Sequence, residues 1–414
     1  MDCYPVYQIT TPKSDASSGF LIATACLLLL LSFGYRAGFG LFVRPITEAN
    51  GWGREIISIA LAVQNLFWGI IAFFAGGLAD RFGNVKVVVA GTFLYALGMV
   101  LMPGVDNPWQ LNASAGILVG AGIAGTSFGI ILPAMARAVG PQRQQWALGL
   151  GTAAGSIGQF AIVPLAQVLI DAYGWGLTLN ILAGSALIMA LLAMPLAPYS
   201  GRPRSGQIEK DQTVPEALQE ALHYRSFLLL VMGFFVCGFH VAFITAHMPA
   251  FITDLGFDPK VGAWSISIIG LCNVFGAYLS GMISGRMSMR YLLVFIYAAR
   301  TVVITLFLMI PFSLVSVLMF SATMGFLWLA TVPPTSGLVA LMFGTRYMAM
   351  LYGIVFLGHQ VGSFIGVWLG GWLFDRSGSY GLVWWLGAAL GVMAAILHWL
   401  MSERPVKRLD AKGI

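Results

Sequence analysis

Charged residues are scarce in this sequence. Asp, Glu, Lys and Arg together make up only 9% of its 414 residues, whereas 58% of the residues are hydrophobic. Soluble domains carry about 25% charged and about 45–50% apolar residues, so this composition excludes an ordinary soluble protein and also a disordered one. With a mean hydropathy of +0.85, the chain is predicted to be an integral membrane protein.

Patterns that carry enzyme chemistry or metal binding are also missing. The four cysteines, Cys3, Cys26, Cys237 and Cys272, have no metal-ligand spacing, and we interpret them as small apolar core residues. The chain contains no phosphate-binding P-loop and no Gly-x-Ser-x-Gly nucleophile motif. We therefore expect no enzyme activity, no cofactor and no metal. The net charge of +6 comes mostly from short loops and does not indicate a nucleic-acid partner.

Twelve apolar runs are long enough to cross a bilayer, which takes about 20 residues in a helix. They lie at residues 20–43, 56–79, 85–103, 111–137, 145–170, 175–196, 226–252, 261–285, 291–310, 312–341, 347–373 and 382–401. Backbone groups that face lipid must be hydrogen-bonded within their own segment, so each run is predicted to be a helix. The predicted fold class is an all-α membrane protein with twelve transmembrane helices.

One long segment is polar. Residues 198–224 are rich in Pro and Gly and carry charges of both signs, which predicts a linker between an N-terminal half (1–197) and a C-terminal half (225–414) with a short tail. An amphipathic helix is predicted at 215–222. Of the Lys and Arg outside the spans, only Arg44, Arg54, Lys260 and Arg376 lie on the membrane side opposite the linker. Because cytoplasmic loops carry the excess of Lys and Arg, we expect the linker and both termini to be cytoplasmic.

The two halves are related by an internal repeat. A shift of 204 positions places Gly149, Gly158, Phe160, Asp171 and Gly174 on Gly353, Gly362, Phe364, Asp375 and Gly378. Such repeats are typical of secondary transporters, whose substrate site lies between the repeats. We therefore predict two pseudo-symmetric six-helix halves with the site at their interface.

The loop after the second predicted helix carries a distinctive pattern. It reads Gly76-Gly77-Leu78-Ala79-Asp80-Arg81-Phe82-Gly83-Asn84-Val85-Lys86, and a carboxylate at a helix end beside two cations can form a latch that breaks and re-forms. We assign Gly76, Asp80, Arg81, Gly83 and Lys86 to a cytoplasmic gating loop. The pattern resembles the G-x-L-A-D-R-x-G-R-K signature of the major facilitator superfamily, with Asn84 at a usually basic position. The resemblance implies the major facilitator fold and a secondary transporter that works by alternating access.

Other segments resemble one branch of that superfamily, which holds the monocarboxylate transporters and the oxalate/formate antiporter. These segments are residues 34–42, Gly51-Trp52-Gly53-Arg54, His359-Gln360-Val361-Gly362 and 374–380. The resemblance implies a small organic anion, in particular a carboxylate, as substrate and a bacterial cytoplasmic (inner) membrane as location. The better-known carboxylate carriers of this branch place an arginine in the eighth helix, where this sequence offers only Asn273 as a strongly polar residue.

Ionisable residues at the centre of a membrane are costly and therefore point to function. No Asp or Glu falls in the middle of a predicted span, but Arg36 and Arg300 do, and each costs roughly 2.5–3.5 kcal/mol to insert. An anionic substrate could offset this cost, and backbone carbonyls or water could also do so. We predict a substrate or coupling role for Arg36, which the repeat places opposite His240, and a structural role for Arg300.

Three histidines are candidates for proton coupling, because a neutral imidazole can take up a proton near physiological pH. His240 and His247 are seven residues apart and share a helix face, while Tyr352 and His359 lie on one stripe of the eleventh helix. A hydrogen-bonded core histidine is the alternative for each. The predicted substrate-binding residues are Arg36, Tyr35, His240, His359, Tyr352 and Gln159, and the proton-coupling candidates are His240, His359 and His247.

These features predict a secondary transporter for a small organic anion, coupled to protons or exchanging one anion for another, and acting as a monomer in the lipid bilayer. The alternative is a multidrug-type exporter for hydrophobic or cationic compounds. Such carriers usually place a carboxylate at mid-depth to meet a cation, and the predicted spans have none there.

Overall fold

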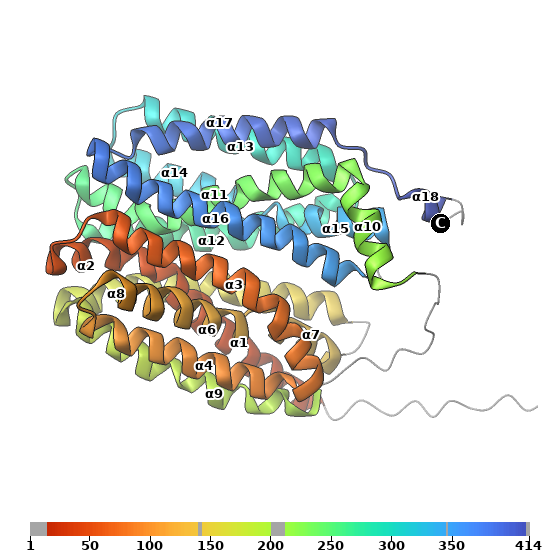
Figure 1. The fold of residues 1–414 in the computed structure, drawn as a ribbon, viewed down its shortest axis with the longest axis horizontal. Coiled ribbons are helices and arrows are strands. Elements are labelled where there is room, and N and C mark those ends of the chain that lie inside the picture. The colour runs from red at the N-terminus through yellow and green to blue at the C-terminus, as the bar shows by residue number, and fades with distance from the viewer. Residues whose placement is uncertain (1–14, 140–142, 200–211, 345–346, 411–414) are drawn as a thin grey trace, which may run out of the picture.

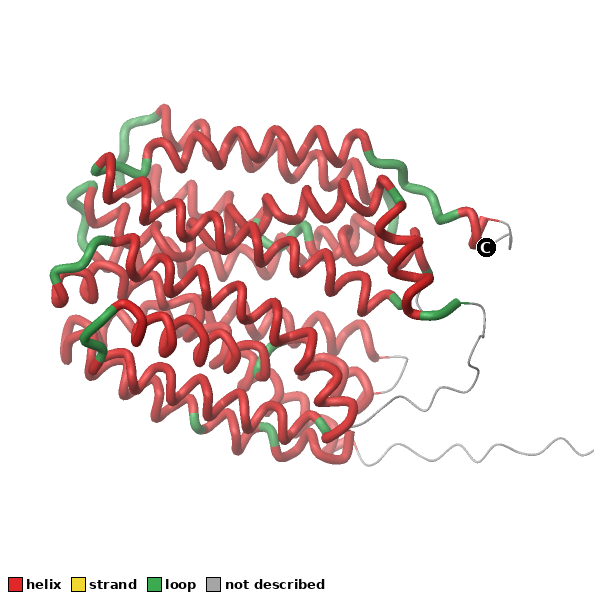
Figure 2. The backbone as a smooth tube through the Cα atoms, viewed as in Figure 1, coloured by secondary structure: helices red, strands yellow, loops and turns green. Residues whose placement is uncertain are grey.

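The protein is a bundle of long helices. The computed structural model describes residues 15–139, 143–199, 212–344 and 347–410. Every regular element in these ranges is a helix (Figure 2). The all-α prediction is confirmed.

The N-terminal half begins with α1 (Asp15–Gly38), which continues through the 3-10 turn η1 (Phe39–Phe42) into α2 (Val43–Asn50). The next long helices are α3 (Arg54–Phe82) and α4 (Asn84–Leu101), and α4 ends in the turn η2 (Met102–Gly104). The fourth span is assembled from α5 (Pro108–Leu111), η3 (Asn112–Leu118), α6 (Val119–Gly125) and α7 (Phe128–Val139). The half ends with α8 (Gln144–Ala186), α9 (Ile188–Leu192) and η5 (Met194–Tyr199).

Helix α8 accounts for one crossing of the membrane and part of the next. Eleven segments of the described chain are long and apolar enough to span a membrane, and one of them, Trp146–Pro198, has 53 residues. At about 1.5 Å per residue, that length is far more than one bilayer needs. Gly174 breaks the segment, because its φ of 77° and ψ of 164° are not helical. The fifth and sixth predicted spans lie on either side of Gly174, and the prediction of twelve crossings is confirmed.

The C-terminal half follows a short helix, α10 (Val214–His223), which covers the amphipathic helix predicted at 215–222. A capping box between Thr213 and Glu216 starts α10, and the hydrogen bond from the Thr213 N–H holds the pKa of the Glu216 carboxyl below its usual value. The long helices of this half are α11 (Arg225–Asp254), α12 (Pro259–Ser284), α13 (Met289–Met309), α14 (Leu314–Leu327), α15 (Val332–Phe343), α16 (Met348–Ser377) and α17 (Gly381–Leu400). A last short helix, α18, covers Lys407–Asp410.

The tenth span is broken, whereas the sequence pattern predicted one continuous helix over 312–341. The structure divides it into α14 and α15 with a turn at residues 328–331. Pro333 and Pro334 stand in the first turn of α15, and a proline has no N–H to continue a preceding helix. The hydropathy of the segment gives no sign of this break, because the residues on both sides of it are apolar.

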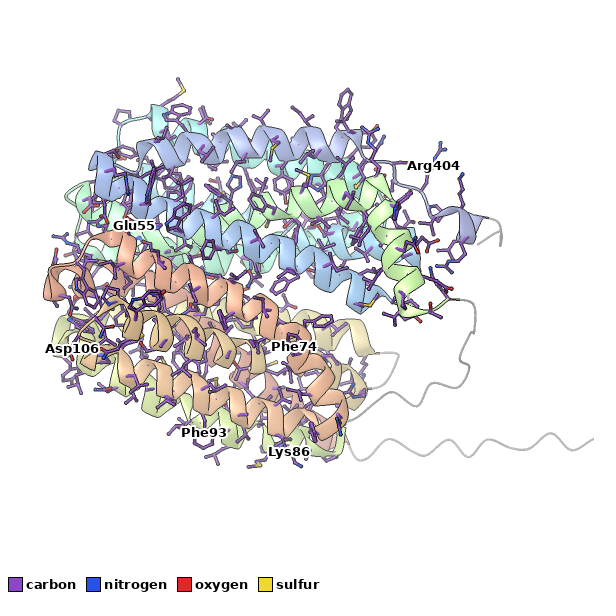
Figure 3. All side chains as sticks on the ribbon, in the orientation of Figure 1. Glu55, Phe74, Lys86, Phe93, Asp106 and Arg404 are labelled. Atoms are coloured by element: carbon purple, nitrogen blue, oxygen red, sulfur yellow. The ribbon has the colours of Figure 1, made fainter. Side chains whose placement is uncertain are left out.

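The helices form two groups, one from each half of the chain (Figure 1). Between the halves, α3 packs on α16 and α8 packs on α12. The two groups meet at the end of the molecule where α2 lies, which we call the far end, and they diverge toward the linker and the C terminus (Figure 1). Phe93 points outward from the bundle (Figure 3) and is 57% exposed, as expected for a side chain that faces lipid.

Close helix packing explains the glycines that the repeat relates. Within the N-terminal half α1 packs on α8, and within the C-terminal half α11 packs on α16. A Cβ atom on Gly158 would overlap the backbone of Leu30, and a Cβ atom on Gly362 would overlap the backbone of Phe235. Small residues let helix backbones approach closely in a membrane, so the repeat preserves one helix crossing in each half.

Candidate substrate site between the two halves

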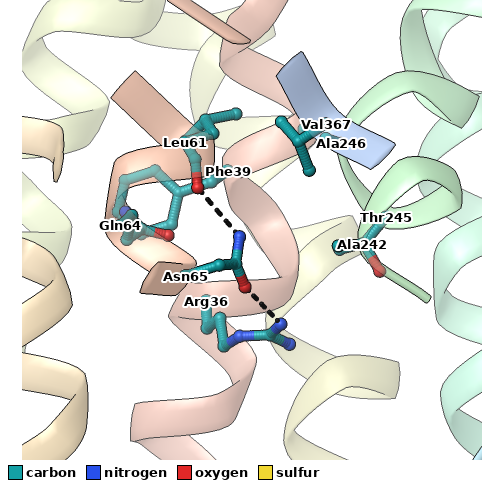
Figure 4. Close-up of a pocket in the computed structure, with 10 residues that line it drawn as sticks. Arg36, Phe39, Leu61, Gln64, Asn65, Ala242, Thr245, Ala246 and Val367 are labelled. Atoms are coloured by element: carbon teal, nitrogen blue, oxygen red, sulfur yellow. Dashed lines mark hydrogen bonds between the residues drawn. The ribbon is translucent and has the colours of Figure 1, made fainter. Parts of the chain in front are cut away.

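A small cavity lies where the two halves meet (Figure 4). Its N-terminal wall comes from α1, η1 and α3, and its C-terminal wall from α11 and α16. The space between its atoms is no more than about 290 Å³, and the lining residues are Arg36, Phe39, Gly40, Leu61, Gln64, Asn65, Ala242, Thr245, Ala246 and Val367. That figure includes open space at the edge of the cavity, and only about 20 Å³ is free for the centre of a water-sized sphere. Ligand sites hold roughly 300–1,000 Å³, so in this conformation the cavity has room for about one water molecule, and a substrate could bind here only after the halves move apart.

Arg36 supplies the charge of this cavity. Its Nη2 donates a hydrogen bond to Oδ1 of Asn65 at 3.1 Å, and its guanidinium carbon lies 4.6 Å from the ring centre of Trp68. Within the described part of the chain, Arg36 has no salt bridge to a carboxylate. A cation–π contact stabilises such a group by about 0.5–2 kcal/mol but does not neutralise it. The positive charge is therefore available to a ligand.

The amide side chains beside Arg36 are held in place by α3 and its neighbour η3. Nδ2 of Asn65 donates to the carbonyl of Leu61 at 2.8 Å, which leaves Oδ1 turned toward Arg36 (Figure 4). Nε2 of Gln64 donates to the carbonyl of Ala115 at 2.8 Å. These bonds fix the polar wall of the cavity before any ligand arrives.

The opposite wall is mostly apolar. Ala242, Ala246 and Val367 face the cavity, and the hydroxyl of Thr245 donates to its own helix, at the carbonyl of Val241. The cavity thus has one charged, hydrogen-bonding side and one hydrocarbon side. With the halves moved apart, these two walls would match a molecule that has a single anionic end and a small apolar body.

His359 is connected to Arg36 through the side chain of Gln360 and through Asn65, which accepts one bond with its backbone and the other with its side chain. Its Nδ1 lies 3.0 Å from Oε1 of Gln360, and Nε2 of Gln360 donates to the backbone carbonyl of Asn65 at 3.0 Å. The side chain of Asn65 then accepts the bond from Arg36. His359 does not line the cavity, but this chain of bonds joins it to the cavity wall across the two halves. Tyr352 lies two turns away on α16 and packs against Phe234.

The structure does not place His240 opposite Arg36. Nε2 of His240 lies 2.7 Å from the carbonyl of Gly387 in α17, within the C-terminal half. The face of α11 that lines the cavity carries Ala242, Thr245 and Ala246, and at about 100° per residue His240 is roughly half a turn away from it. The repeat correctly aligns the sequences of α1 and α11. It does not reveal which face of α11 is turned toward the cavity.

Three other predicted residues also lie outside the cavity lining. The Tyr35 hydroxyl pairs with Oγ of Ser185 at 2.9 Å in the N-terminal half. Nε2 of His247 lies 2.8 Å from the carbonyl of Val367, behind the cavity wall. Gln159 donates from α8 to the carbonyl of Ile266 in α12 at 2.7 Å, at a different junction between the halves.

Arg300 has the structural surroundings that the sequence predicted. It is fully buried, and its guanidinium donates to the carbonyls of Leu327 and Trp328. These carbonyls end α14 at the break in the tenth span, where a helix leaves acceptors without partners. Arg300 therefore supplies hydrogen bonds to carbonyls at the end of α14, and it does not line the cavity.

The predicted gating loop forms a tight turn between α3 and α4. Gly83 has a φ of 91°, in the region that favours glycine, and its N–H donates to the carbonyl of Ala79 at 2.9 Å. Arg81 and Lys86 are exposed, Gly76 is half-buried, and the side chain of Asp80 lies outside the described part of the structure. Asn84, at the usually basic position, donates to the carbonyl of Ile130 in α7 at 2.8 Å. The gating role of this loop stays a prediction.

A group of charged contacts at the far end joins the two halves and was not predicted as a unit. We call it the far-end cluster: Arg54, Glu55, Asp254, Asp375, Arg376 and Tyr380. Arg54 forms two bonds to the carboxylate of Asp254, at 2.5 and 2.7 Å, and one to the Tyr380 hydroxyl at 2.9 Å. Burial raises the pKa of Tyr380, although the neighbouring Arg54 opposes this rise, so the hydroxyl stays neutral.

Asp375 completes this cluster from α16. Its two carboxylate oxygens accept the backbone N–H groups of Arg54 and Glu55 at 2.8 and 2.7 Å, so a residue of one half caps a helix of the other half. Arg376 lies 3.4 Å from Glu55. The sequence signals were that Arg54 and residues 374–380 stood in family-like segments at predicted helix ends and that the repeat pairs Asp375 with Asp171.

The sequence matches the Major Facilitator Superfamily over residues 25–356. The chain belongs to that superfamily. The likeness covers most of both halves, and it confirms the fold predicted from the repeat and the loop after the second span.

Individual relatives agree with this assignment. The chain is 24% identical to an uncharacterized MFS-type transporter, YcxA, of Bacillus subtilis, over 84% of this chain and 86% of the relative. It is 27% identical to monocarboxylate transporter 13 of Rattus norvegicus, over 96% and 94%. The fold also resembles the crystal structure of a bacterial homologue of the human lysosomal transporter Spinster in an inward-facing, occupied conformation, with a TM-score of 0.74, 14% identity and coverage of 94% and 97%. The present chain, as a member of this superfamily, is therefore a multi-pass membrane protein and a secondary transporter, not an enzyme.

Proposed function

We propose that this transporter carries a small organic anion, with a carboxylate as the group that it recognises, and that Arg36 binds this carboxylate. The observation that carries the proposal is the guanidinium of Arg36 in a cavity between the halves, without a salt bridge to any carboxylate of the described chain. A carboxylate can accept two parallel hydrogen bonds from a guanidinium and neutralise its charge. The likeness to monocarboxylate transporter 13 supports the same substrate class.

Each wall of the cavity recognises a different end of the substrate. The carboxylate end binds at Arg36 beside the amide of Asn65, and the hydrocarbon end packs against Ala242, Ala246 and Val367. A second carboxylate on the same molecule would meet the apolar wall, where burying a charge without a partner is costly. A small monocarboxylate therefore fits better than a dicarboxylate.

Transport proceeds by alternating access across the cytoplasmic (inner) membrane, with the linker and both termini on the cytoplasmic side. Either a proton accompanies the anion or a second anion returns in exchange. Among the three histidines, His359 is the preferred proton carrier, because hydrogen bonds through Gln360 and Asn65 connect it to Arg36. His240 and His247 bind backbone carbonyls of their own half.

A multidrug-type exporter for cationic compounds is not favoured. The described cavity lining contains no carboxylate that could attract a cation, and Arg36 would repel one. An uncharged hydrophobic compound would leave the buried charge of Arg36 without a partner, which is unfavourable.

Uptake by reconstituted protein tests the proposal. Purified protein in liposomes is supplied with radiolabelled lactate, pyruvate, acetate or malonate, and initial rates are compared with those of Arg36→Ala. Loss of one charge-assisted hydrogen-bonding group costs about 1.5–3 kcal/mol, so we expect uptake of the monocarboxylates to fall by about 10- to 100-fold. Arg44→Ala is the matched control, because it removes an arginine from the exposed Arg44–Glu48 pair outside the cavity. Full uptake by Arg36→Ala would refute the assigned role.

A further inference from the structure

Two glutamines join the two halves by the same kind of contact. Gln360 of α16 donates from Nε2 to the backbone carbonyl of Asn65 in α3 at 3.0 Å. Gln159 of α8 donates from Nε2 to the backbone carbonyl of Ile266 in α12 at 2.7 Å. Each bond runs from a helix of one half to the main chain of a helix in the other half.

Each glutamine also packs on a glycine. A Cβ atom on Gly69 would lie 2.8 Å from Cγ of Gln360, and a Cβ atom on Gly270 would lie 2.9 Å from Cγ of Gln159. In both cases the glycine stands four residues after the accepting carbonyl, which is one helical turn. While the glutamines are in place, a side chain on Gly69 or Gly270 would overlap Cβ and Cγ of Gln360 or Gln159, so these two glycines allow the close approach.

The two contacts are related by the internal repeat. The same interval of 201 residues separates the two glutamines, the two glycines and the two accepting residues, Asn65 and Ile266. This interval differs by only three residues, about one turn, from the shift of 204 that relates the glycines of the fifth and eleventh spans. Donor, acceptor and packing partner therefore all recur in the second half, as expected for one contact present twice.

Symmetry fixes how these contacts lie in the membrane. Parallel repeats of this kind are related by an axis along the membrane normal, so equivalent points lie at equal depth. One contact joins α3 to α16 and the other joins α8 to α12, the two pairs of helices with the most extensive contact between the halves. The interval of 201 differs by about one turn from the shift of 204 between glycines of the same two helices, so the two contacts match in depth to within about 5 Å. A line through both contacts thus lies close to the membrane plane and crosses the interface.

We infer that these two contacts, Gln360 with Gly69 and Gln159 with Gly270, form the pivot about which the halves rock. Rotation about a line leaves the distances between points on that line unchanged. Both hydrogen bonds therefore persist while the ends of the helices separate and approach. The far-end cluster lies away from this line and must break when that end opens. The inference rests on the transporter assignment and not on the identity of the substrate.

The pivot is adjacent to the substrate site. Asn65 accepts the pivot bond with its backbone carbonyl and the bond from Arg36 with its side chain. Arg36 consequently lies close to the axis, where rocking of the halves displaces a bound molecule least. Gln159 and Gln360 are positioning residues: they set the distance between the halves without touching the substrate.

Cysteine cross-links separate a pivot from a contact that exists in one conformation only. The cysteines of the chain are first replaced by serine. One variant then carries Gly69→Cys with Gln360→Cys, and a second carries Gly270→Cys with Gln159→Cys. The control carries Arg54→Cys with Asp254→Cys, which replaces a salt bridge of the far-end cluster. Uptake of radiolabelled lactate into liposomes is measured after oxidation and again after reduction.

The pivot predicts opposite outcomes for the two kinds of cross-link. Oxidised pivot variants should retain at least half of the uptake of their reduced forms, whereas the oxidised far-end variant should lose uptake more than tenfold and regain it on reduction. Reversible loss of uptake in both pivot variants would overturn the inference, because it would show that these contacts open during transport.

A second measurement needs neither a known substrate nor a change at the buried contacts. Spin labels are placed on the exposed side chains beside each contact, as the pairs Ile70 with Val361 and Ile157 with Leu271. A third pair, Glu48 with Lys260, reports on the far end. Each pair is introduced as cysteines into the chain whose own four cysteines are serine, and it is measured there and with Arg54→Ala, which removes the far-end salt bridge.

With Arg54→Ala, the Glu48–Lys260 distances should shift to a longer population, while both pairs beside the contacts keep one narrow distribution. If the pairs beside the contacts lengthen together with the far-end pair, or if no pair changes while the far-end cross-link still blocks uptake, the assignment of the pivot is wrong. This readout stands even if no carboxylate is transported, so failure of the pivot and failure of the proposed substrate are distinguishable.

Discussion

Individual side chains decide what this transporter can bind. Arg36 is the charged group of the cavity, and its orientation depends on Asn65 and on the ring of Trp68. The sequence predicted Arg36, because an intramembrane arginine without an acidic neighbour is rare. It did not predict Trp68, because twelve tryptophans are present and nothing in their spacing marks the one that stacks on Arg36.

Replacing the Trp68 ring should weaken substrate binding without abolishing transport. Trp68→Leu removes a cation–π contact of about 0.5–2 kcal/mol, so we expect KM to rise about 2- to 30-fold while the maximal rate changes little. Trp68→Phe is the matched control, because it keeps an aromatic face beside Arg36. A Trp68→Leu variant with the parental KM would show that the stacking does not contribute to binding.

His359 should separate coupled uptake from exchange. If His359 carries the proton, His359→Gln abolishes accumulation of the anion against its gradient but leaves exchange of labelled for unlabelled anion intact. The control is His398→Gln, because His398 lies in α17 and bonds to the carbonyl of Ala394 in its own helix. Proton-driven accumulation that survives His359→Gln would assign coupling to another group.

Whole helices set how the halves close. Asp375 caps the first turn of α3 with two hydrogen bonds, and a carboxylate at a helix N-terminus is favoured by the helix dipole. Because α3 and α16 belong to different halves, this cap contributes to closure only while the far end is closed. Sequence periodicity locates such helices along the chain, but it cannot reveal a cap that comes from a residue more than 300 positions away.

Removing this cap should open the far end. Loss of an N-terminal cap costs about 0.5–2 kcal/mol, so Asp375→Ala should raise the population that is open at the far end about 2- to 30-fold. The rate at which a membrane-impermeant maleimide reacts from that side with Thr245→Cys, in the cavity lining, measures this population. Glu48→Ala is the control, because the Arg44–Glu48 pair lies within one helix. Equal reaction rates in both variants would contradict the proposed closure by Asp375.

The complete molecule reflects its duplicated sequence. Hydropathy and the repeat predicted twelve crossings and two six-helix halves, because lipid forces each apolar run to be a helix. The boundaries of the domains, 1–197 and 225–414, stay predictions, since part of the linker lies outside the described residues. The sequence could not resolve the face of each helix: His240 and Tyr35 proved to point into their own halves, because packing between neighbouring helices, not the chain pattern, sets their rotation.

The orientation of the molecule in the membrane is open to a direct test. The distribution of Lys and Arg predicts that α10 is cytoplasmic and that the loop before α12 is on the other side. In intact cells of a cysteine-free variant, an impermeant maleimide should label Lys260→Cys, and it should label His223→Cys only after permeabilisation. Both residues are exposed. The reverse pattern would invert the predicted topology.

Carboxylate recognition by this transporter depends most on the charge of Arg36, and ligand-induced stabilisation tests that charge directly. The melting temperature of the purified protein is measured with propionate and with propionamide, which have nearly the same shape but differ in charge. A ligand at about 100 times its Kd stabilises the folded form by about 2.7 kcal/mol. We predict that propionate raises the melting temperature of the parent protein, that propionamide does not, and that Arg36→Ala responds to neither. Equal shifts with the acid and the amide, or an undiminished shift with propionate in Arg36→Ala, would contradict the account.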